Sequence, residues 1–400
     1  MPQQRARLHR LWNRDAQMRS RSILCVLATA VLCLAAAPPP SNPSPTKALK
    51  LRALPRSAAW SGQQAIAADA KGRVFLLHTA TLEVHPIGSG GELGEAQKLE
   101  RLPDSEAPMM LLNAALSADG RRWLAQDFGS PRGLVLFENG KEKLLPATEW
   151  LPTGVGFAGD DPLFAAAAMQ MGEVLGASTR QEPPFLRVLS SGGWKTIATD
   201  PIDAANPLEL LAAAKDGREV IFARGAEGSF WVVQRHLYRL RRFSGAGRQL
   251  EEVRLGDARV QYSSQTKGEQ ERLEDFAGEA KKSGHLLPQN FGTGKKAQRV
   301  LEGAALGFDG RLYVLVSPEA NEGSDRPALD RYDPTAGVLT RVDLEVADPI
   351  RRSTMAAGRD GLFLAAEPGH GGRWFISWEA LDAAHWRDVP RAEVGTKINP

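Results

Sequence analysis

A short strand–turn–strand pattern recurs along this chain and restricts its fold more than any other feature. Five segments share a run of small or apolar residues, an acidic residue or Lys, a Gly and a second apolar run; their turn glycines are Gly72, Gly120, Gly228, Gly310 and Gly361. A weaker copy surrounds Asp161. Such periodicity indicates an array in which one unit buries its apolar face only against the next unit.

A second turn follows most copies of the first, so each repeat contains four antiparallel strands. The second turns are Asn139-Gly140, Gly192-Gly193, the segment 244–247 and the segment 333–337. Four-stranded repeats of about 40–50 residues are the blades of β-propellers. The sequence therefore predicts an all-β, six-bladed β-propeller over residues 47–395, with seven blades as the alternative.

Two intervals between first turns are longer than a blade needs, and each predicts a short, partly helical insertion. In residues 201–217, Asn206 suits a helix N-cap and Pro207 the first helical position. A rival interpretation makes this segment an inner strand turning at Gly217, but Gly228 matches the repeat better. Residues 257–297 are charged and helix-forming, without a strand-like apolar run.

The ring needs a closing strand, because an open propeller would expose sheet edges. The segment ALKLRALP at 48–55 is expected to complete the last blade, which runs from Ser353 to about Val394. Residues 396–400 form a tail.

The amino-terminal segment 1–37 has the pattern of an export signal. Six Arg and one Asp precede an uncharged apolar stretch at 23–37, and a Pro-rich linker follows at 38–46. The expectation is a cleaved signal peptide, with an uncleaved signal anchor as the alternative. The protein would then be periplasmic, extracellular or anchored to the cell envelope, and it would meet a membrane only through residues 1–37 if these stay uncleaved.

Charge and cysteine content exclude several classes of function. Both cysteines lie within residues 1–37, so the remainder can form neither a disulfide nor a thiolate metal site. Without that segment the chain carries 44 Lys and Arg against 46 Asp and Glu. A net charge of −2 does not indicate a nucleic-acid partner.

The first residues of the innermost strands are predicted to face the central axis near one mouth of the channel. Most of these positions are polar, and the candidate ligand-binding residues are Gln64, Asn113, Thr153, Glu302 and Ser353. Such a ring can bind a small ligand, and Glu302 is the candidate metal ligand for a divalent cation. The alternative is that these groups bond one another and water, as buried polar groups do.

Long loops gather on one face and supply the other functional hypothesis. Both insertions are predicted to connect an outer strand to the next inner strand, so they share a face with the loops 169–184 and 317–328. His370 and Arg373 are candidate binding residues in another loop of this kind. Function commonly resides on such loops.

The segments EGSFWVV, DGRLYVL and RYDPTAG resemble the repeats of six-bladed propellers of the NHL and senescence-marker/gluconolactonase type. The resemblance covers most of residues 47–395 and implies the same fold. Lactonases of that group hold a divalent cation at the channel mouth with a Glu, an Asn and an Asp. Their first-blade Glu-Gly-Pro pattern is replaced here by SGQQAIAAD at 61–69.

The leading expectation is an exported, non-catalytic propeller that binds a protein, peptide or glycan through its looped face. The first alternative is a divalent-metal-dependent hydrolase or lyase of lactonase type, and the second is a scaffold in the cell envelope.

Overall fold

The structure is a computed structural model, and its described part starts at Ala48 and ends at Gly395. The residues that it leaves undescribed within this range are 55–63, 103–110, 128–131, 171–183, 201–215, 226–227, 256–260, 265–266, 269, 272–294, 322–323, 347–353, 367–371 and 390–391. The predicted signal segment 1–37, the linker 38–46 and the tail 396–400 also lie outside the described residues. No helix in the described ranges is long and apolar enough to cross a membrane.

Six antiparallel sheets of four strands, in sequence order from the inner to the outer strand, form the blades. Blade 1 contains β3 (Gln64–Ala68), β4 (Val74–His78), β5 (Glu83–Ile87) and β6 (Gln97–Lys98). Blade 2 contains β7 (Leu111–Leu116), β8 (Arg122–Asp127), β9 (Leu134–Glu138) and β10 (Lys141–Lys143). Blade 3 contains β11 (Trp150–Ala158), β12 (Asp161–Gln170), β13 (Pro184–Ser190) and β14 (Gly193–Thr199).

Blades 4 and 5 follow the same order, and blade 6 takes its outer strand from the amino-terminal segment. Blade 4 contains β15 (Val220–Arg224), β16 (Phe230–Gln234), β17 (Arg239–Phe243) and β18 (Gln249–Leu255). Blade 5 contains β21 (Leu301–Leu306), β22 (Leu312–Val316), β23 (Ala328–Asp333) and β24 (Val338–Glu345). Blade 6 contains β25 (Thr354–Ala357), β26 (Gly361–Ala365), β27 (Arg373–Ser377) and, out of sequence order, β2 (Arg52–Ala53).

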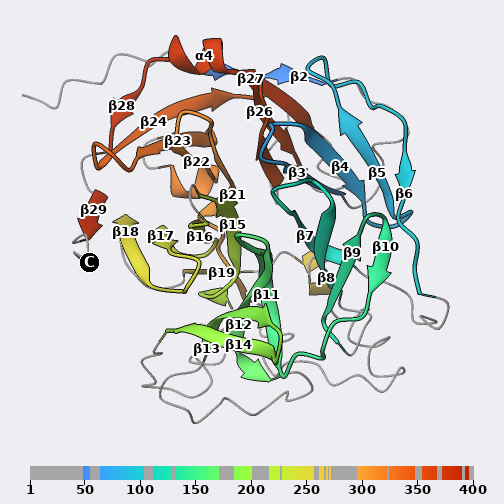
Figure 1. The fold of residues 1–400 in the computed structure, drawn as a ribbon. Coiled ribbons are helices and arrows are strands. Elements are labelled where there is room, and N and C mark those ends of the chain that lie inside the picture. Colours follow the sequence, from blue (N-terminus) through green and yellow to red (C-terminus); the bar gives the residue numbers. More distant parts are fainter. Residues whose placement is uncertain are drawn as a thin grey trace, which may run out of the picture. The chain divides into compact units, whose positions relative to one another are not determined.

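The inner strands form a closed ring around one axis (Figure 1). Each packs against the inner strand of the next blade, in the order β3, β7, β11, β15, β21, β25 and back to β3. The predicted six-bladed β-propeller is confirmed. The glycines of four predicted first turns, Gly72, Gly120, Gly228 and Gly310, have φ between 72° and 77°, a conformation that glycine adopts without strain.

The core consists of six clusters, one between each pair of adjacent blades, because both faces of a blade are apolar. Trp231 of blade 4 packs beside Tyr332 of blade 5, and Leu364 of blade 6 lies in one cluster with Leu315 of blade 5. The last cluster joins Phe363 of blade 6 to Leu76 of blade 1. A single blade would leave these surfaces in water, so the ring is the unit of stability.

An amino-terminal strand closes the ring, as the sequence predicts. In β2, Arg52 pairs with Phe375 and Ala53 with Trp374 of β27. The preceding short strand β1 (Leu49–Lys50) was not expected. It runs parallel to β24 of blade 5, with Leu49 opposite Leu344.

The carboxyl-terminal segment departs from the expectation that the last blade extends to Val394. Blade 6 ends with β27 at Ser377, whose side chain caps the helix α4 (Trp378–Asp382) by accepting a bond from the Ala380 amide. The chain then adds β28 (Arg387–Asp388) to β24 and β29 (Ala392–Gly395) to β18. It therefore covers the outer edges of blades 5 and 4.

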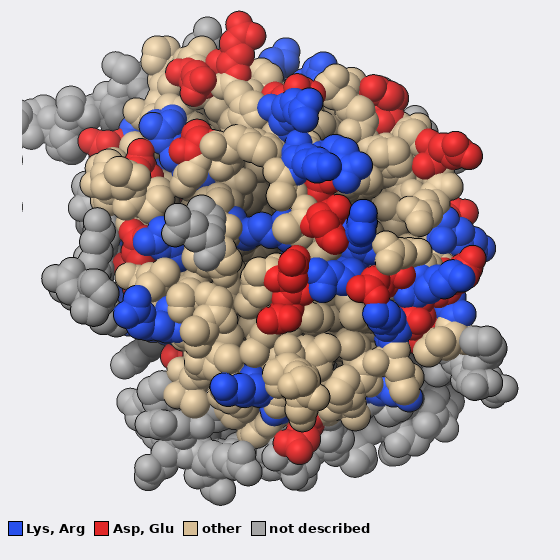
Figure 2. All heavy atoms as spheres, in the orientation of Figure 1, with Lys and Arg blue, Asp and Glu red and all other residues tan. Residues whose placement is uncertain are grey.

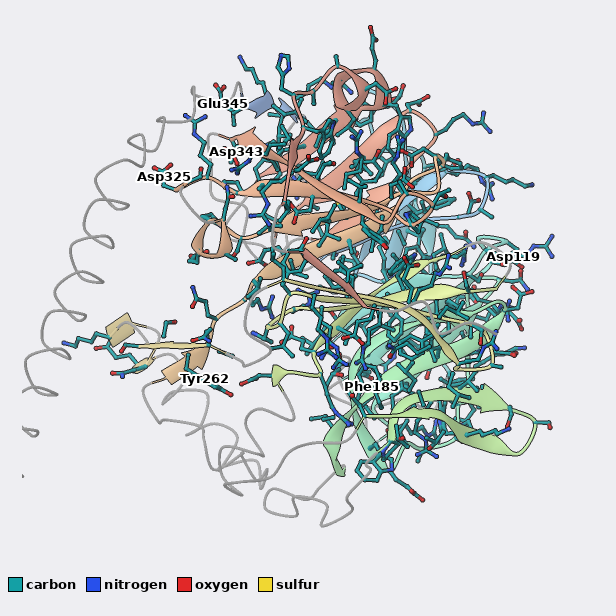
Figure 3. The ribbon with its side chains drawn as sticks, turned by 90° about the vertical axis from the view of Figure 1, so that its left-hand side faces the viewer. Asp119, Phe185, Tyr262, Asp325, Asp343 and Glu345 are labelled. Atoms are coloured by element: carbon teal, nitrogen blue, oxygen red, sulfur yellow. The ribbon has the colours of Figure 1, made fainter. Side chains whose placement is uncertain are left out.

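The two insertions lie mostly outside the described residues. Most of the expected helix within 206–217 falls there; the inner strand of blade 4 is β15, which precedes the turn at Gly228. In the second insertion, β19 (Tyr262–Ser264) and β20 (Lys295–Ala297) form an antiparallel pair that the sequence did not predict. Figure 3 shows Tyr262 and the loop residue Asp325 on the side opposite to Asp119, which lies in a first turn.

Candidate functional site

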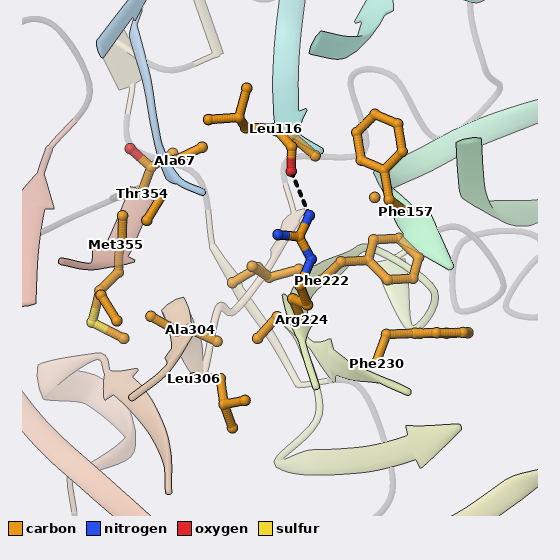
Figure 4. Close-up of a pocket in the computed structure, with 18 of the residues that line it drawn as sticks. Ala67, Leu116, Phe157, Phe222, Arg224, Phe230, Ala304, Leu306, Thr354 and Met355 are labelled. Carbon is orange, nitrogen blue, oxygen red and sulfur yellow. Dashed lines mark hydrogen bonds between the residues drawn. The ribbon is translucent and has the colours of Figure 1, made fainter. Parts of the chain in front are cut away.

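The central channel contains a cavity with a volume of about 490 Å³ (Figure 4). All six inner strands contribute small residues to its wall: Ala67, Ala114, Gly156, Ala223, Ala304 and Ala356. Phe157, Phe222, Phe230 and Met355 add larger apolar surface. A volume of this size lies within the range of small-molecule pockets, roughly 300–1,000 Å³.

The guanidinium of Arg224, from the last residue of β15, projects into this cavity (Figure 4). Its Nη2 donates a hydrogen bond of 2.9 Å to the carbonyl oxygen of Leu116, which belongs to blade 2. Burial lowers the pKa of Arg224, and the carboxylates of Asp160, Asp69 and Asp119 partly oppose this shift. The other ionisable residues of the wall, among the described residues, are Asp69 and Arg235.

The described residues of the predicted ring bond other partners, either within their own blade or in the neighbouring blade. Asn113 Nδ2 donates to Gln126 Oε1 at 2.8 Å, and Gln126 Nε2 donates to the Pro152 carbonyl of blade 3 at 2.6 Å. Thr153 Oγ1 donates to the carbonyl of Arg218, before blade 4, at 2.6 Å. Of the described ring residues, only Asn113 lines the cavity.

Two predicted binding residues do meet, although they came from different hypotheses. Arg373 Nη2 donates to Gln64 Oε1 at 3.2 Å, which joins blades 6 and 1. Ser353 and His370 lie outside the described residues, so the structure does not place them.

Glu302, the candidate metal ligand, is buried with 4% of its surface exposed. Its Oε2 lies 4.0 Å from Nη1 of Arg299, and a guanidinium repels a bound cation. No group of three or more His, Cys, Asp and Glu side chains suited to a metal ion occurs in the described part of the chain.

Sequence reasoning missed a charged cluster beside Glu302 that joins blades 4 and 5. Glu219 receives a bond of 2.7 Å from Arg299 and lies 2.9 Å from Nε2 of His236 and 3.5 Å from Nε of Arg235. Arg299 is 80 residues from Glu219 in the chain, so no local motif connects them. The His and the two Arg residues showed no ligand-type spacing in the sequence.

Electrostatics keep Glu219 ionised. Burial by itself would raise the pKa of Glu219, but Arg299, His236 and Arg235 outweigh it and hold the pKa well below its ordinary value. The Nδ1 atom of His236 lies 3.1 Å from the carbonyl oxygen of Gln298, so both ring nitrogens face acceptors. The cluster therefore works as an ionic link between blade 4 and the strand that enters blade 5.

The face that carries the first turns has mixed charge around its centre, as Figure 2 shows. Asp69 pairs with Arg73 at 2.6 Å, and Arg122 of blade 2 pairs with Asp160 of blade 3 at 2.9 Å. Asp119 accepts a bond of 3.0 Å from the Arg121 amide, a contact that stabilises the turn.

No protein-family model matches this chain, and no curated protein matches it. Three solved structures illustrate its similarity to known propellers. A virginiamycin B lyase from Staphylococcus aureus is 14% identical over 85% of this chain and 88% of its own, with a TM-score of 0.41. The calcium-binding protein regucalcin from Agrobacterium tumefaciens is 15% identical over 83% and 92%, with a TM-score of 0.36. The structure of U3-55K is 9% identical over 83% and 99%, with a TM-score of 0.45. Sequence identities and TM-scores this low do not show any activity for this chain.

Proposed function

We propose that this protein is a non-catalytic binding propeller that holds a small, largely apolar molecule in its central channel. The observation that carries the proposal is the cavity of about 490 Å³, walled by alanines, phenylalanines and Met355 from the ring of inner strands. An apolar wall with few polar groups is typical of small-molecule sites, because burial of apolar surface stabilises the complex.

The composition of the wall supports binding rather than hydrolysis. A hydrolase needs a nucleophile or a general base that faces its substrate. The ionisable wall residues in the described ranges are one acid, Asp69, and two arginines. Asp69 already accepts a hydrogen bond of 2.7 Å from Nε of Arg73, which reduces its availability as a base.

The neutral probe decan-1-ol, titrated into the full chain by isothermal calorimetry, tests this proposal. Ala67→Phe would fill part of the cavity from β3 and is expected to abolish the binding seen with the wild type. Ala383→Phe is the matched control, because Ala383 is exposed beyond the end of α4. Equal binding to wild type and Ala67→Phe, both folded, would contradict a site in the channel.

The other expectations from the sequence stay proposals. Export through residues 1–37, and a location in the periplasm, outside the cell or in the envelope, depend on a segment outside the described residues. The same holds for a protein, peptide or glycan partner on the looped face, because most of both insertions is not described. A metal-dependent hydrolase of lactonase type and an envelope scaffold remain alternatives; stabilisation by a divalent cation that Glu302→Gln removes would favour the first.

A further inference from the structure

Arg224 uses little of its hydrogen-bonding capacity toward the described residues. A guanidinium carries five N–H donors, and within the described ranges the Arg224 side chain gives one hydrogen bond, to the Leu116 carbonyl. Its Nε is shielded from solvent and meets no acceptor among the described residues. A buried donor without a partner costs free energy, which a ligand that accepts its hydrogen bond would recover.

The nearby acids are engaged with other groups. Asp69 binds Arg73, and Asp160 binds Arg122. Asp119 Oδ1 accepts a bond of 2.6 Å from the Ser117 hydroxyl, which is the largest of the causes that lower the pKa of Asp119. Within the described ranges, none of the three forms an ion pair with Arg224. Among the described residues, the guanidinium of Arg224 therefore has one hydrogen-bond partner, the neutral main-chain carbonyl of Leu116.

The surroundings of Arg224 determine which anion can fit. Leu116, Phe157, Phe222 and Phe230 lie around its side chain in Figure 4. These groups cannot solvate a second or third negative charge, so a polyanion such as a phosphate ester would be poorly stabilised. A carboxylate carries one charge, and its two oxygens match the planar fork of N–H groups on Arg.

We propose that the channel binds a small organic monoanion, a carboxylate with an apolar body, and that Arg224 holds its carboxylate. The apolar body occupies the space between the alanines of the inner strands. This inference rests on the proposed binding function of the channel and adds the chemical class of the ligand.

The test compares three ten-carbon probes by isothermal calorimetry with the full chain at pH 7: decanoate, decan-1-ol and decyltrimethylammonium. Decanoate is expected to bind at least about tenfold more tightly than decan-1-ol, a difference of about 1.4 kcal/mol. In Arg224→Gln this advantage disappears, so that the ratio of the two affinities falls to about one. Arg311→Gln is the matched control and changes neither affinity, because Arg311 is a basic residue of a first turn that pairs with Asp333 at 3.1 Å.

The outcomes separate the two proposals. If decan-1-ol binds and decanoate binds no more tightly, or if Arg224→Gln leaves the ratio unchanged, the channel function stands and the carboxylate inference is overturned. The inference is also overturned if decyltrimethylammonium binds more tightly than decanoate. If none of the probes binds the wild type, both proposals fail. If Arg224→Gln does not fold, Arg224→Lys replaces it in the test. This variant keeps the positive charge but lacks the planar pair of N–H donors, so a weaker preference for decanoate is expected.

Discussion

Replacing Asp330 by Leu is expected to destabilise the propeller by about 3–5 kcal/mol, because it leaves a buried charge without its counter-ion. Asp330 in β23 is fully buried, and Arg341 in β24 is 5% exposed. The Nε and Nη2 atoms of Arg341 donate to the two oxygens of Asp330 at 2.6 and 2.8 Å. The hydroxyl of Tyr238, which precedes β17 in blade 4, donates to the same carboxylate. The cluster therefore joins two blades.

The magnitude follows from which groups lose their partners. In Asp330→Leu, Arg341 remains charged in a site that no longer neutralises it, and this term accounts for most of the loss. The double variant Asp330→Leu/Arg341→Met removes both charges and is expected to recover about 2 kcal/mol or more. It should stay below the wild type, because a buried Tyr238 hydroxyl without its acceptor costs about 1–3 kcal/mol.

Urea denaturation followed by tryptophan fluorescence measures these differences. Glu100→Gln is the control, because Glu100 and Lys141 are both exposed and lie 3.9 Å apart. That change should cost less than about 1 kcal/mol. A double variant no more stable than Asp330→Leu alone would refute the reasoning, since the loss would then come from packing and not from the unpaired charge.

Three further predictions concern pH, sheet edges and close packing. Burial alone would raise the pKa of Glu252, but hydrogen bonds from Arg239 and Arg254 outweigh burial and lower this pKa from 4.5 to about 2. The ionised carboxylate therefore stabilises the fold above pH 4.5, and this contribution is lost as the pH falls toward 2. Glu252→Gln should therefore flatten the pH dependence of urea stability between pH 4.5 and 2, and an unchanged slope would contradict this origin. Deletion of residues 384–400 removes β28 and β29 and exposes the edges of β24 and β18 that they cover. Light scattering should then detect self-association of the truncated protein through these edges. A monodisperse monomer would contradict the role of the two strands in edge protection. Gly154→Ala should lower the thermal midpoint, because its Cβ would lie 2.6 Å from the Val220 carbonyl oxygen, whereas Gly192→Ala, with nothing within 4 Å, should have little effect.

The fold could be predicted largely from the sequence because its signals are local. A turn glycine such as Gly120 or Gly310 needs a positive φ whatever surrounds it, and the flanking apolar runs specify strands. The interval between turns then sets the size of a blade. Ring closure by residues 48–55 was predicted because an open ring would expose sheet edges, and the pairing of β2 with β27 confirms it.

The candidate site could be predicted only in part. Counting along the repeats located the inner strands and placed Asn113 in the cavity wall. It did not show that Asn113 bonds Gln126 or that Gln64 bonds Arg373, because those contacts depend on how adjacent blades face each other. Arg224 ends an inner strand with no motif around it, so nothing in the sequence marked it as a group that enters the channel.

The sequence by itself predicted the propeller, favoured six blades over seven and indicated the strand that closes the ring, because turn geometry and alternating apolar residues are properties of short segments. Only the tertiary structure decided which charges meet. Glu219, His236 and Arg299 come together because two blades pack side by side, and Arg224 reaches Leu116 because the inner strands of blades 4 and 2 face one channel. The pairing of the carboxyl-terminal strands with blades 4 and 5 was equally beyond the sequence, since segments of two and four residues are too short to show strand periodicity.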